Sequence, residues 1–301
     1  MIMRNSKQQY KIVIDPQYGY RHLEPLPTSE ELERFYVEKY FSDIAKSNTR
    51  ALGIKRLMKE DDEKQFELNW LSATRWRDIF DILNQNLSDG QKRSLLDVGC
   101  GLGHFGQYMA QAGYRVSGIE PSRYAQEVAR SFGINIYSAI EDCLQAGQYF
   151  DAITLLYVLE HIPDPVDMLK KVQKLMKKDS LLVIMVPNDF STLQVSACNK
   201  LGLAPWWIAI PDHINYFNFE SIVKLVEQLG FQVIEIYGDF PMEMFLLFGD
   251  VYVGNPELGS LCHKKRVSFE LALAPEVRRD IYRTFAKAGI GRSCLLFAKY
   301  S

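Results

Sequence analysis

Between Ser94 and Tyr237, short apolar runs alternate with amphipathic stretches, and this alternation constrains the fold more than any other feature of the chain. The best-marked helical stretches span 164–178 and 218–230, and the apolar runs span 94–98, 115–120, 134–137, 150–160, 181–188 and 231–237. Strands that alternate with helices predict a doubly wound α/β fold around a mostly parallel sheet. The final apolar run, 294–300, ends the chain after an interruption of about fifty residues, so we expect it at an edge of the sheet.

The segments that flank the alternating region predict a helical cap and an insertion. Residues 1–27 are polar and rich in proline and tyrosine, which indicates an extended arm. Thr28 and Glu31 have the spacing of a capping box, and apolar residues at helical spacing follow them. We therefore expect an arm and a helical cap in residues 1–90. Residues 91–301 should form the main domain, with an insertion at about 238–290 over the ligand end of the sheet.

Charge and cysteine usage exclude several classes of function. The net charge is -2 and the isoelectric point is near 6.2, which argues against a broad surface for nucleic acid. The five cysteines form no C-x-x-C pair and the five histidines are scattered along the chain, so we expect reduced thiols and no metal site. The first residues lack an apolar signal core, and no apolar run approaches the roughly 20 residues of a membrane span. We therefore expect a cytoplasmic protein.

The turn after the first apolar run, DVGCGLGHFG, carries a nucleotide-binding signature that can be read in two registers. Gly101, Gly103 and Gly106 spell the dinucleotide fingerprint, whereas Gly99, Gly101 and Gly103 behind Asp97 spell the loop that holds S-adenosylmethionine (SAM). A dinucleotide would bring a pyrophosphate to this turn, and the carboxylate of Asp97 would repel it. SAM carries a sulfonium and an ammonium against one carboxylate, so Asp97 favours SAM.

Glu120, at the end of the second apolar run, indicates a nucleoside without deciding between the two cofactors. A carboxylate there can accept hydrogen bonds from both ribose hydroxyls in either class.

Three stretches resemble the motifs of class I SAM-dependent methyltransferases. They are LLDVGCGLGHFGQYMAQAGYRVSGIEPS, FDAITLLYVLEHIPDPVDML and DHINYFNFESIVKLVEQLGFQVIEI. The resemblance covers roughly residues 92–237 and the last strand, and it implies a seven-stranded Rossmann-like sheet with an antiparallel final strand. The segment LEPLPTSEELERFYVEKYF is similar to that of bacterial enzymes that methylate sugars or surface polysaccharides. Many of those carry a zinc ribbon that is absent here, because no cysteine precedes Cys100.

The resemblance implies a set of SAM-binding residues. They follow the first four strands of the main domain: Asp97, Gly99, Cys100, Gly101, Gly103, Glu120, Pro121, Ser122, Ile140, Glu141 and Tyr157. Ile140 and Glu141 would grip adenine through the backbone and an acidic side chain, and Tyr157 would face the methionine part of SAM.

His213 and His161 are the candidate catalytic residues. His213 lies in PDHINYFN, where the chain returns from the carboxyl end of a strand, and a pKa near 6.5 suits a general base for a hydroxyl acceptor. A histidine that only anchors this loop is an equally good interpretation. His161 follows the fourth strand, and a positioning role is favoured over base catalysis there.

Aromatic and basic residues are candidates for acceptor binding. Tyr36 and Tyr40 lie on the expected cap, and Trp206, Trp207 and Tyr216 flank His213; aromatic faces line sugar pockets well, although core packing explains such residues equally simply. Lys264, Lys265, Arg266 and Arg292 could bind the phosphates of a nucleotide-linked sugar, or they could form a solvated basic loop.

These observations predict a SAM-dependent methyltransferase that acts on a small-molecule or glycan acceptor, most simply at the oxygen of a sugar or polysaccharide-related compound. Methylation of carbon or nitrogen on a nucleotide sugar or another metabolite is the alternative within enzymes. An NAD-binding oxidoreductase and a non-catalytic SAM-binding module are the rivals from other classes.

Overall fold

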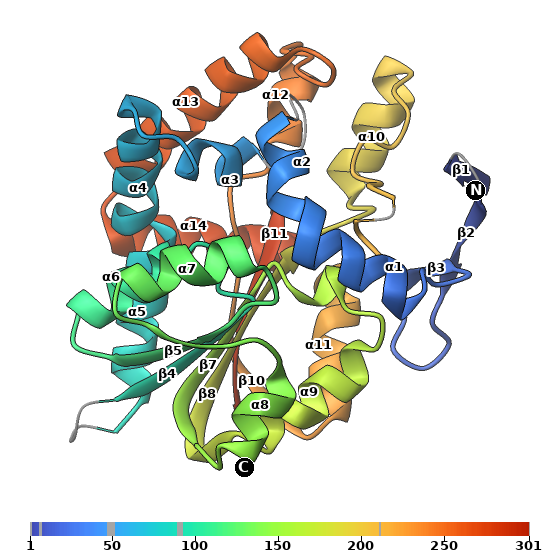
Figure 1. The fold of residues 1–301 in the computed structure, drawn as a ribbon. Coiled ribbons are helices and arrows are strands. Elements are labelled where there is room, and N and C mark those ends of the chain that lie inside the picture. The colour runs from blue at the N-terminus through green and yellow to red at the C-terminus, as the bar shows by residue number, and fades with distance from the viewer. Residues whose placement is uncertain (1, 6–7, 47–51, 89–92, 211, 301) are drawn as a thin grey trace.

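A computed structural model of the chain describes residues 2–5, 8–46, 52–88, 93–210 and 212–300 (Figure 1). A seven-stranded sheet forms its centre, in the order β10-β11-β8-β7-β4-β5-β6. These strands are β4 (Ser94–Val98), β5 (Arg115–Ile119), β6 (Asn135–Tyr137), β7 (Phe150–Leu156), β8 (Met176–Pro187), β10 (Phe231–Gly238) and β11 (Ser293–Tyr300). Strands β4 to β8 are parallel, and β11 is antiparallel to both of its neighbours. The predicted doubly wound sheet with an antiparallel final strand is confirmed.

Both faces of this sheet are buried, because alternate residues of the central strands enter two separate cores. Leu182, Ile184 and Val186 of β8 face one core, and Val183 and Met185 face the other. The first core also contains side chains of α8 (Ile140–Gln145), α9 (Pro165–Gln173) and α11 (Phe219–Gln228). The second contains side chains of α4 (Asp62–Ala73), α5 (Arg75–Asn86), α6 (His104–Gln111), α7 (Arg123–Ser131), α13 (Pro256–Ala272) and α14 (Pro275–Ala288).

The expectation that the final strand lies at an edge is wrong. β11 sits between β10 and β8, and β10 forms the edge (Figure 1). Leu296 of β11 packs in the first core and Phe297 in the second, so β11 is covered on both faces like any internal strand. Gln232 of β10 is exposed. The apolar run CLLFAKY therefore indicated the internal position of β11 better than its place at the end of the chain did.

Several local boundaries also differ from the expected ones. The helix expected at 164–178 ends at Gln173, and β8 begins at Met176, which pairs with Phe150. β7 ends at Leu156 because Tyr157 has a positive φ of 61°, and a short 3-10 helix, η2 (Leu159–His161), follows. The helix α10 (Thr192–Leu201) was not expected from the sequence, although its capping box at Ser191 and Gln194 marks its start.

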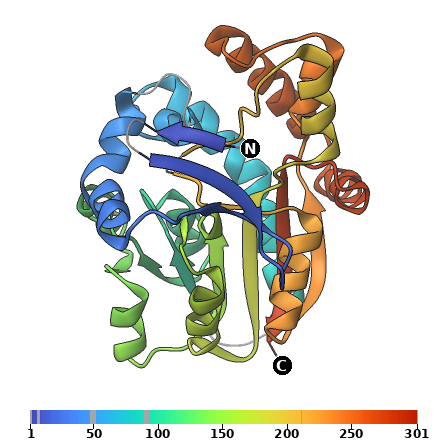
Figure 2. The same cartoon turned by 90° about the vertical axis from the view of Figure 1, so that its right-hand side faces the viewer.

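The N-terminal segment is extended, but it is paired. β1 (Ile2–Asn5), β2 (Gln8–Ile14) and β3 (Arg21–Glu24) form an antiparallel sheet with β9 (Asn215–Tyr216), which Figure 2 shows in front of the main sheet. The cap follows as α1 (Ser29–Arg34), a π-helix η1 (Phe35–Lys39), α2 (Tyr40–Lys46) and α3 (Leu52–Leu57). The pairing of β3 with β9 joins the start of the chain to the loop that carries His213.

Within residues 238–290, the first helices lie at the carboxyl end of the parallel strands, whereas α14 packs against β10. The antiparallel β11 ends at Tyr300, so the C-terminus marks the opposite, amino end. Figure 1 shows α10, α13 and α12 (Glu243–Phe248) far from the C-terminus, at the other end of the sheet. α13 packs against α4. Among the described helices, none is long and apolar enough to span a membrane.

A buried ion-pair network ties the cap helices to the C-terminal helices. Arg278 of α14 is 1% exposed, and its guanidinium donates to both carboxylate oxygens of Asp78 on α5, at 2.9 and 3.2 Å. Arg279 donates to the same carboxylate at 3.0 Å. Arg279 also binds Asp81 at 3.2 Å, whereas Asp78 is the only carboxylate that the described residues offer to Arg278, so the stability of this buried pair depends on keeping the charge of Asp78.

Asp78→Asn should lower the free energy of unfolding by about 3–5 kcal/mol, because it leaves the buried guanidinium of Arg278 without its counter-charge. Lys265→Ala is the control: its partner is Asp250, its side chain is 47% exposed, and the cost should be much smaller. Chemical denaturation monitored by circular dichroism measures both. Equal costs for the two variants would contradict the assignment of this network as a structural tie.

Candidate functional site

The glycine-rich turn connects β4 to α6, and its three glycines serve different purposes. A Cβ on Gly99 would lie 2.7 Å from Val158, and one on Gly103 would lie 2.7 Å from Ala129, so these positions allow close packing of the turn. A Cβ on Gly101 would meet nothing within 4 Å, although φ is +52°. The turn is therefore packed on two sides and open at Gly101, where a ligand can approach the backbone.

Glu120 is held at the end of β5 by backbone amides. Gly101 N–H donates to Oε2 at 2.9 Å, and Ser122 N–H donates to Oε1 at 2.8 Å. The carboxylate is 7% exposed, and this burial raises its pKa to about 7, against the opposing effect of the two amides. Pro121 follows, and Ser122 is the N-cap of α7. Glu120 is thus fixed in place with lone pairs that remain for hydroxyl donors.

Asp97 lies inside the sheet end, where the hydroxyl of Thr154 donates to its Oδ1 at 2.6 Å. Burial raises its pKa to about 7, and the nearby charge of Glu120 acts in the same direction. The neighbouring Cys100 thiol is also buried, which raises its pKa. Two desolvated carboxylates next to the open glycine turn favour a positively charged ligand and disfavour a pyrophosphate.

A cavity of about 350 Å³ lies between the cap and the start of α7, next to the segment that follows Glu120. Its lining comes from η1, α2, the segment after α3, and the start of α7: Tyr36, Val37, Tyr40, Phe41, Ala45, Met58, Ser122 and Tyr124. The volume is in the range of small-molecule and cofactor sites. The open face of Gly101, the fixed carboxylate of Glu120 and this mostly apolar cavity together fit SAM, with the cap as its cover.

The two residues expected at adenine are held in different ways. The side chain of Ile140 is 4% exposed and belongs to the core under α8, which leaves its backbone for the expected contact with adenine. The carboxylate of Glu141 pairs with Lys171 at 2.8 Å, and this hydrogen bond lowers its pKa. The carboxylate of Glu141, which the sequence predicts at adenine, therefore already binds Lys171.

Tyr157 contacts α5 and the start of β11 rather than standing free at the strand end. Its hydroxyl lies 2.8 Å from Ser293 Oγ, and the guanidinium of Arg75 lies 5.3 Å from its ring centroid. Burial raises the pKa of its hydroxyl. These contacts engage the ring and the hydroxyl that were expected to face the methionine part of SAM.

His161 and His213 come together at the edge of the cap. Their ring centroids are 5.0 Å apart, and ligand atoms of both rings and of Glu160 all lie within 4.8 Å of one another. The histidines were expected to be scattered, and they are 52 residues apart in the chain, but η2 and β9 pack together and bring them side by side. Backbone bonds fix this contact, since Ile214 N–H donates to Glu160 O at 2.7 Å.

The proton on His161 is placed by its neighbour. Nδ1 lies 2.8 Å from the carbonyl oxygen of Asp212, and a carbonyl can only accept, so Nδ1 is the donor. The Tyr36 hydroxyl lies 3.0 Å from the same nitrogen and 3.1 Å from the same carbonyl. Burial lowers the pKa of His161, but the hydrogen bond with Asp212 and the charge of Glu160 outweigh this and raise it to about 9. A ring that holds its proton at neutral pH suits positioning better than base catalysis.

Tyr36 and Tyr40 join the cavity to this histidine pair. Both line the cavity, and their ring centroids lie 5.8 and 6.4 Å from that of His161. The π-helix η1 widens the turn between them, a feature frequent at functional sites. Burial raises the pKa of both hydroxyls.

The aromatic residues near His213 divide between core and surface. Trp207 and Tyr216 are 5% and 1% exposed and form a small core with Tyr10 and Leu23. The Tyr216 hydroxyl donates to the carbonyl of His213 at 3.0 Å, which ties down the loop instead of facing a substrate. Trp206 is half-buried against Trp207. Of these three expected acceptor contacts, Trp207 and Tyr216 are therefore core residues.

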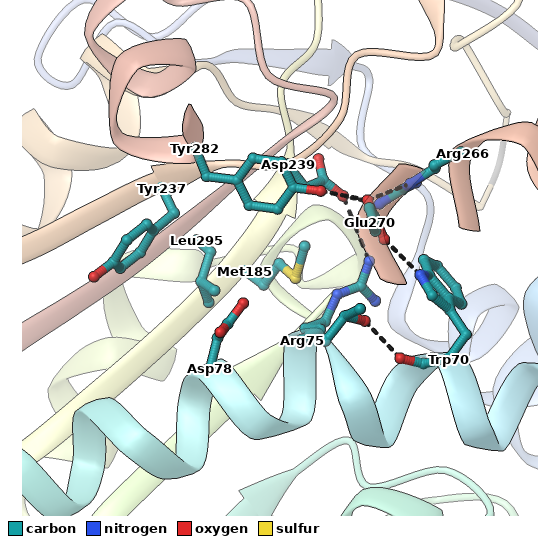
Figure 3. Close-up of a pocket in the computed structure, with 11 residues that line it drawn as sticks. Trp70, Arg75, Asp78, Met185, Tyr237, Asp239, Arg266, Glu270, Tyr282 and Leu295 are labelled. Carbon is teal, nitrogen blue, oxygen red and sulfur yellow. Dashed lines mark hydrogen bonds and ion pairs between the residues drawn. The ribbon is translucent and has the colours of Figure 1, made fainter. Parts of the chain in front are cut away.

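Three of the four basic residues expected at a phosphate, Arg266, Lys265 and Arg292, are already paired. Arg266 donates to Asp239 and Glu270, both at 2.8 Å, at a small cavity that Figure 3 shows. Its volume, about 30 Å³, is that of a single water molecule. Lys265 binds Asp250, and Arg292 binds Glu243. These pairs explain the basic residues structurally, so the phosphate interpretation loses its support.

Sequence reasoning missed Asp189 and Asp212 near the histidine pair, and it paired Glu160 with His161 without giving Glu160 a role of its own. Glu160 and Asp189 are 1% and 2% exposed, and burial raises their pKa values to about 7 and about 8. Asp212 supplies the carbonyl that orients His161. Only Glu160 carried a signal, because it is adjacent to His161 in the sequence.

Comparison with known proteins identifies the family. A family model described as a methyltransferase domain matches residues 71–236, more than half of the chain. The chain belongs to this methyltransferase family. The ubiquinone biosynthesis O-methyltransferase of Actinobacillus pleuropneumoniae serotype 5b is 34% identical over 162 residues, which cover 50% of this chain and 68% of that protein.

Solved structures share the fold at low identity. A SAM-dependent methyltransferase from Archaeoglobus fulgidus aligns with a TM-score of 0.51 and 20% identity over 79% of this chain and 97% of that one. Magnesium protoporphyrin IX methyltransferase from Synechocystis PCC 6803 aligns with a TM-score of 0.54 and 14% identity over 91% and 100%. With the family established, the glycine turn and Glu120 identify the chain as a SAM-dependent methyltransferase.

Glu120→Ala should weaken SAM binding by about 1.5–3 kcal/mol, the range for hydrogen bonds to a charged group. Glu141→Ala is the matched control, because its carboxylate is bound to Lys171. Calorimetric titration of both variants with SAM measures the difference. A loss at Glu141 as large as that at Glu120 would restore the expected adenine contact and contradict the assignment made here.

SAM affinity of this methyltransferase should rise with pH up to about 7. Burial raises the pKa of Glu120 to about 7, so below that pH the free protein holds a proton that a cationic ligand must displace. The same raised pKa makes the free protein lose stability as pH rises from about 4.5 to about 7, and bound SAM restores it. Calorimetry near pH 6 in buffers of different ionisation enthalpy should reveal proton release. An affinity that is independent of pH would contradict this.

Proposed function

We propose that this methyltransferase transfers the methyl group of SAM to a hydroxyl oxygen of a small-molecule acceptor, and that the acceptor is a sugar or a polysaccharide-related compound. The observation that carries the proposal is a set of buried polar side chains at the carboxyl end of the sheet. Glu160, beside His161, and Asp189 lie at the ends of β7 and β8, and Trp207 lies in the small core of the loop before β9. The relative from Actinobacillus, named as an O-methyltransferase, supports oxygen as the methylated atom.

The hydrogen-bonding capacity of this set suits hydroxyl groups. Among the described residues, Glu160 Oε2 and Trp207 Nε1 are buried atoms without a hydrogen-bond partner. One is an acceptor and the other a donor, and a hydroxyl group can both donate and accept. Because buried polar atoms are nearly always paired, such atoms favour a ligand with several hydroxyls. The ring of Phe190, 5.4 Å from that of Trp207, adds the aromatic surface typical of sugar sites.

Methyl transfer from SAM to a hydroxyl oxygen requires mainly that the protein align the two reactants. SAM supplies a methyl group on a sulfonium, which is already a good leaving group. The acceptor oxygen forms a bond to the methyl carbon as the carbon–sulfur bond breaks, and the hydroxyl proton passes to solvent. The chain's task is to hold the oxygen about 3 Å from the methyl carbon, to assist loss of the proton and to exclude water.

The cap and the insertion would complete the site. Tyr36 and Tyr40 link the cavity to His161, so we assign residues 28–87 to covering the cofactor. α10 packs against α12, which places the 238–290 segment beside the loop that carries Trp206 and His213. Both segments are therefore assigned to acceptor selection.

Labelled SAM with a panel of nucleotide sugars, polysaccharide fragments and phenols tests the acceptor class. The expected product is a methyl ether on a sugar, stable to mild base. A labelled product that mild base releases, or a methyl group on carbon or nitrogen, would contradict O-methylation. Transfer to phenols alone would contradict the sugar class and leave O-methylation standing.

His213→Ala should lower turnover by about 10²–10⁴-fold with SAM affinity little changed, because the residue lies on the acceptor side of the site. His263→Ala is the control, since His263 lies on α13, where it contacts Glu67. Steady-state kinetics and SAM titration measure the two effects separately. Near-normal turnover of the His213 variant would remove it from the catalytic centre.

A further inference from the structure

We propose that Glu160, His161 and His213 form a binding site for one divalent first-row transition-metal ion of the Zn²⁺ type. One carboxylate and two imidazoles converge here from two segments, and their ligand atoms lie within 4.8 Å of one another. Ligands about 2.1 Å from a common ion are roughly 3–3.5 Å apart, so a closure of about an ångström completes the site. The ion site stands on this geometry alone, whereas its role toward a hydroxyl rests on the proposed function.

The buried carboxylate of Glu160 is the strongest sign of a cation site. Glu160 is 1% exposed, and its Oε2 has no hydrogen-bond partner among the described residues. Leaving a carboxylate oxygen buried and unpaired is costly, and a bound cation is a common way to satisfy it. The carboxylate of Asp212 lies 3.3 Å from His161 and adds a second negative charge at the same place.

His161 has the orientation of a metal ligand. Its Nδ1–H donates to the carbonyl oxygen of Asp212 at 2.8 Å, so Nε2 is the nitrogen left for an ion, which displaces the proton that the raised pKa of this ring keeps there at neutral pH. Metal-bound histidines almost always donate their other N–H to a carbonyl or a carboxylate, which fixes the tautomer and the ring. The Tyr36 hydroxyl, 3.1 Å from the same carbonyl, reinforces this second layer of contacts.

The backbone around the three residues is preorganised. Ile214 N–H donates to Glu160 O at 2.7 Å, and the Asn215 amide donates to Leu159 O and Ile162 O at 3.0 and 2.7 Å. These bonds lock the segment of His213 onto η2. The ligands are therefore held by regular elements and paired main chain, which is what a metal site requires.

The donor set selects the kind of ion. Two imidazole nitrogens and one carboxylate suit Zn²⁺, Mn²⁺, Fe²⁺ or Co²⁺, whereas Mg²⁺ and Ca²⁺ prefer oxygen ligands alone. Three protein ligands leave a position open for an acceptor oxygen, and a bound ion lowers the pKa of a hydroxyl. His213, which the sequence indicates as a general base, would then assist loss of the proton through the ion.

Titration of the chelator-treated full chain with Co²⁺ tests the site. We expect one ion per chain with visible d–d absorption bands, and displacement of Co²⁺ by Zn²⁺ but not by Mg²⁺. Glu160→Gln and His213→Ala should each weaken Co²⁺ binding by at least about 10²-fold, more than the loss of an outer contact. His263→Ala should bind as the unchanged chain does, and SAM affinity verifies that every variant is folded.

The outcomes separate this proposal from the function above. Co²⁺ binding without d–d bands, or equal binding by the unchanged chain and His213→Ala, overturns the ion site. If the chelator-treated enzyme still transfers methyl groups at the full rate, the ion has no role in the reaction, while the proposed function stands. Specific Co²⁺ binding in a protein that methylates no hydroxyl supports the ion site while the proposed function fails.

Discussion

The contact of His161 with Asp212 and Tyr36 is the interaction on which the site depends. It joins three segments that are far apart in the chain: the cap, the end of β7 and the loop before β9. Without it, the cap would be tied to the sheet mainly through apolar packing, and the two tyrosines of η1 would not be held between the cavity and the histidines. These hydrogen bonds of His161 therefore connect the cofactor cavity with the proposed acceptor side of the site.

Desolvated negative charge is the second constraint. Asp97, Glu120 and Glu160 are all buried, and burial raises each of their pKa values to about 7. Such carboxylates cost stability in the free protein whenever they are ionised. A cationic methyl donor, and a cation at Glu160, would offset that cost, so the free chain is electrostatically incomplete at the places where its ligands are proposed to bind.

The sequence was a good guide wherever the information was local. The strands of the sheet, the glycine turn, Glu120 and the capped start of α9 all follow from residues within a few positions of one another. It was a poor guide to contacts between distant segments. The position of β11, the pairing of Arg266 with Asp239 and the meeting of Glu160 with His213 depend on how elements pack, and no spacing in the chain records that.

This difference has a physical consequence for how the two sides of the crevice can vary. The cofactor side is built at the switch point between β4 and its neighbours, where one contiguous turn and one strand end supply the contacts. The proposed acceptor side needs β7, β8, the loop before β9 and the cap to be placed together. A change in any one of those segments would move polar atoms there and leave Gly101 and Glu120 untouched. The glycine turn and Glu120 therefore supply the methyl-donor contacts, whereas the proposed acceptor side draws on segments both inside and outside the matched residues 71–236.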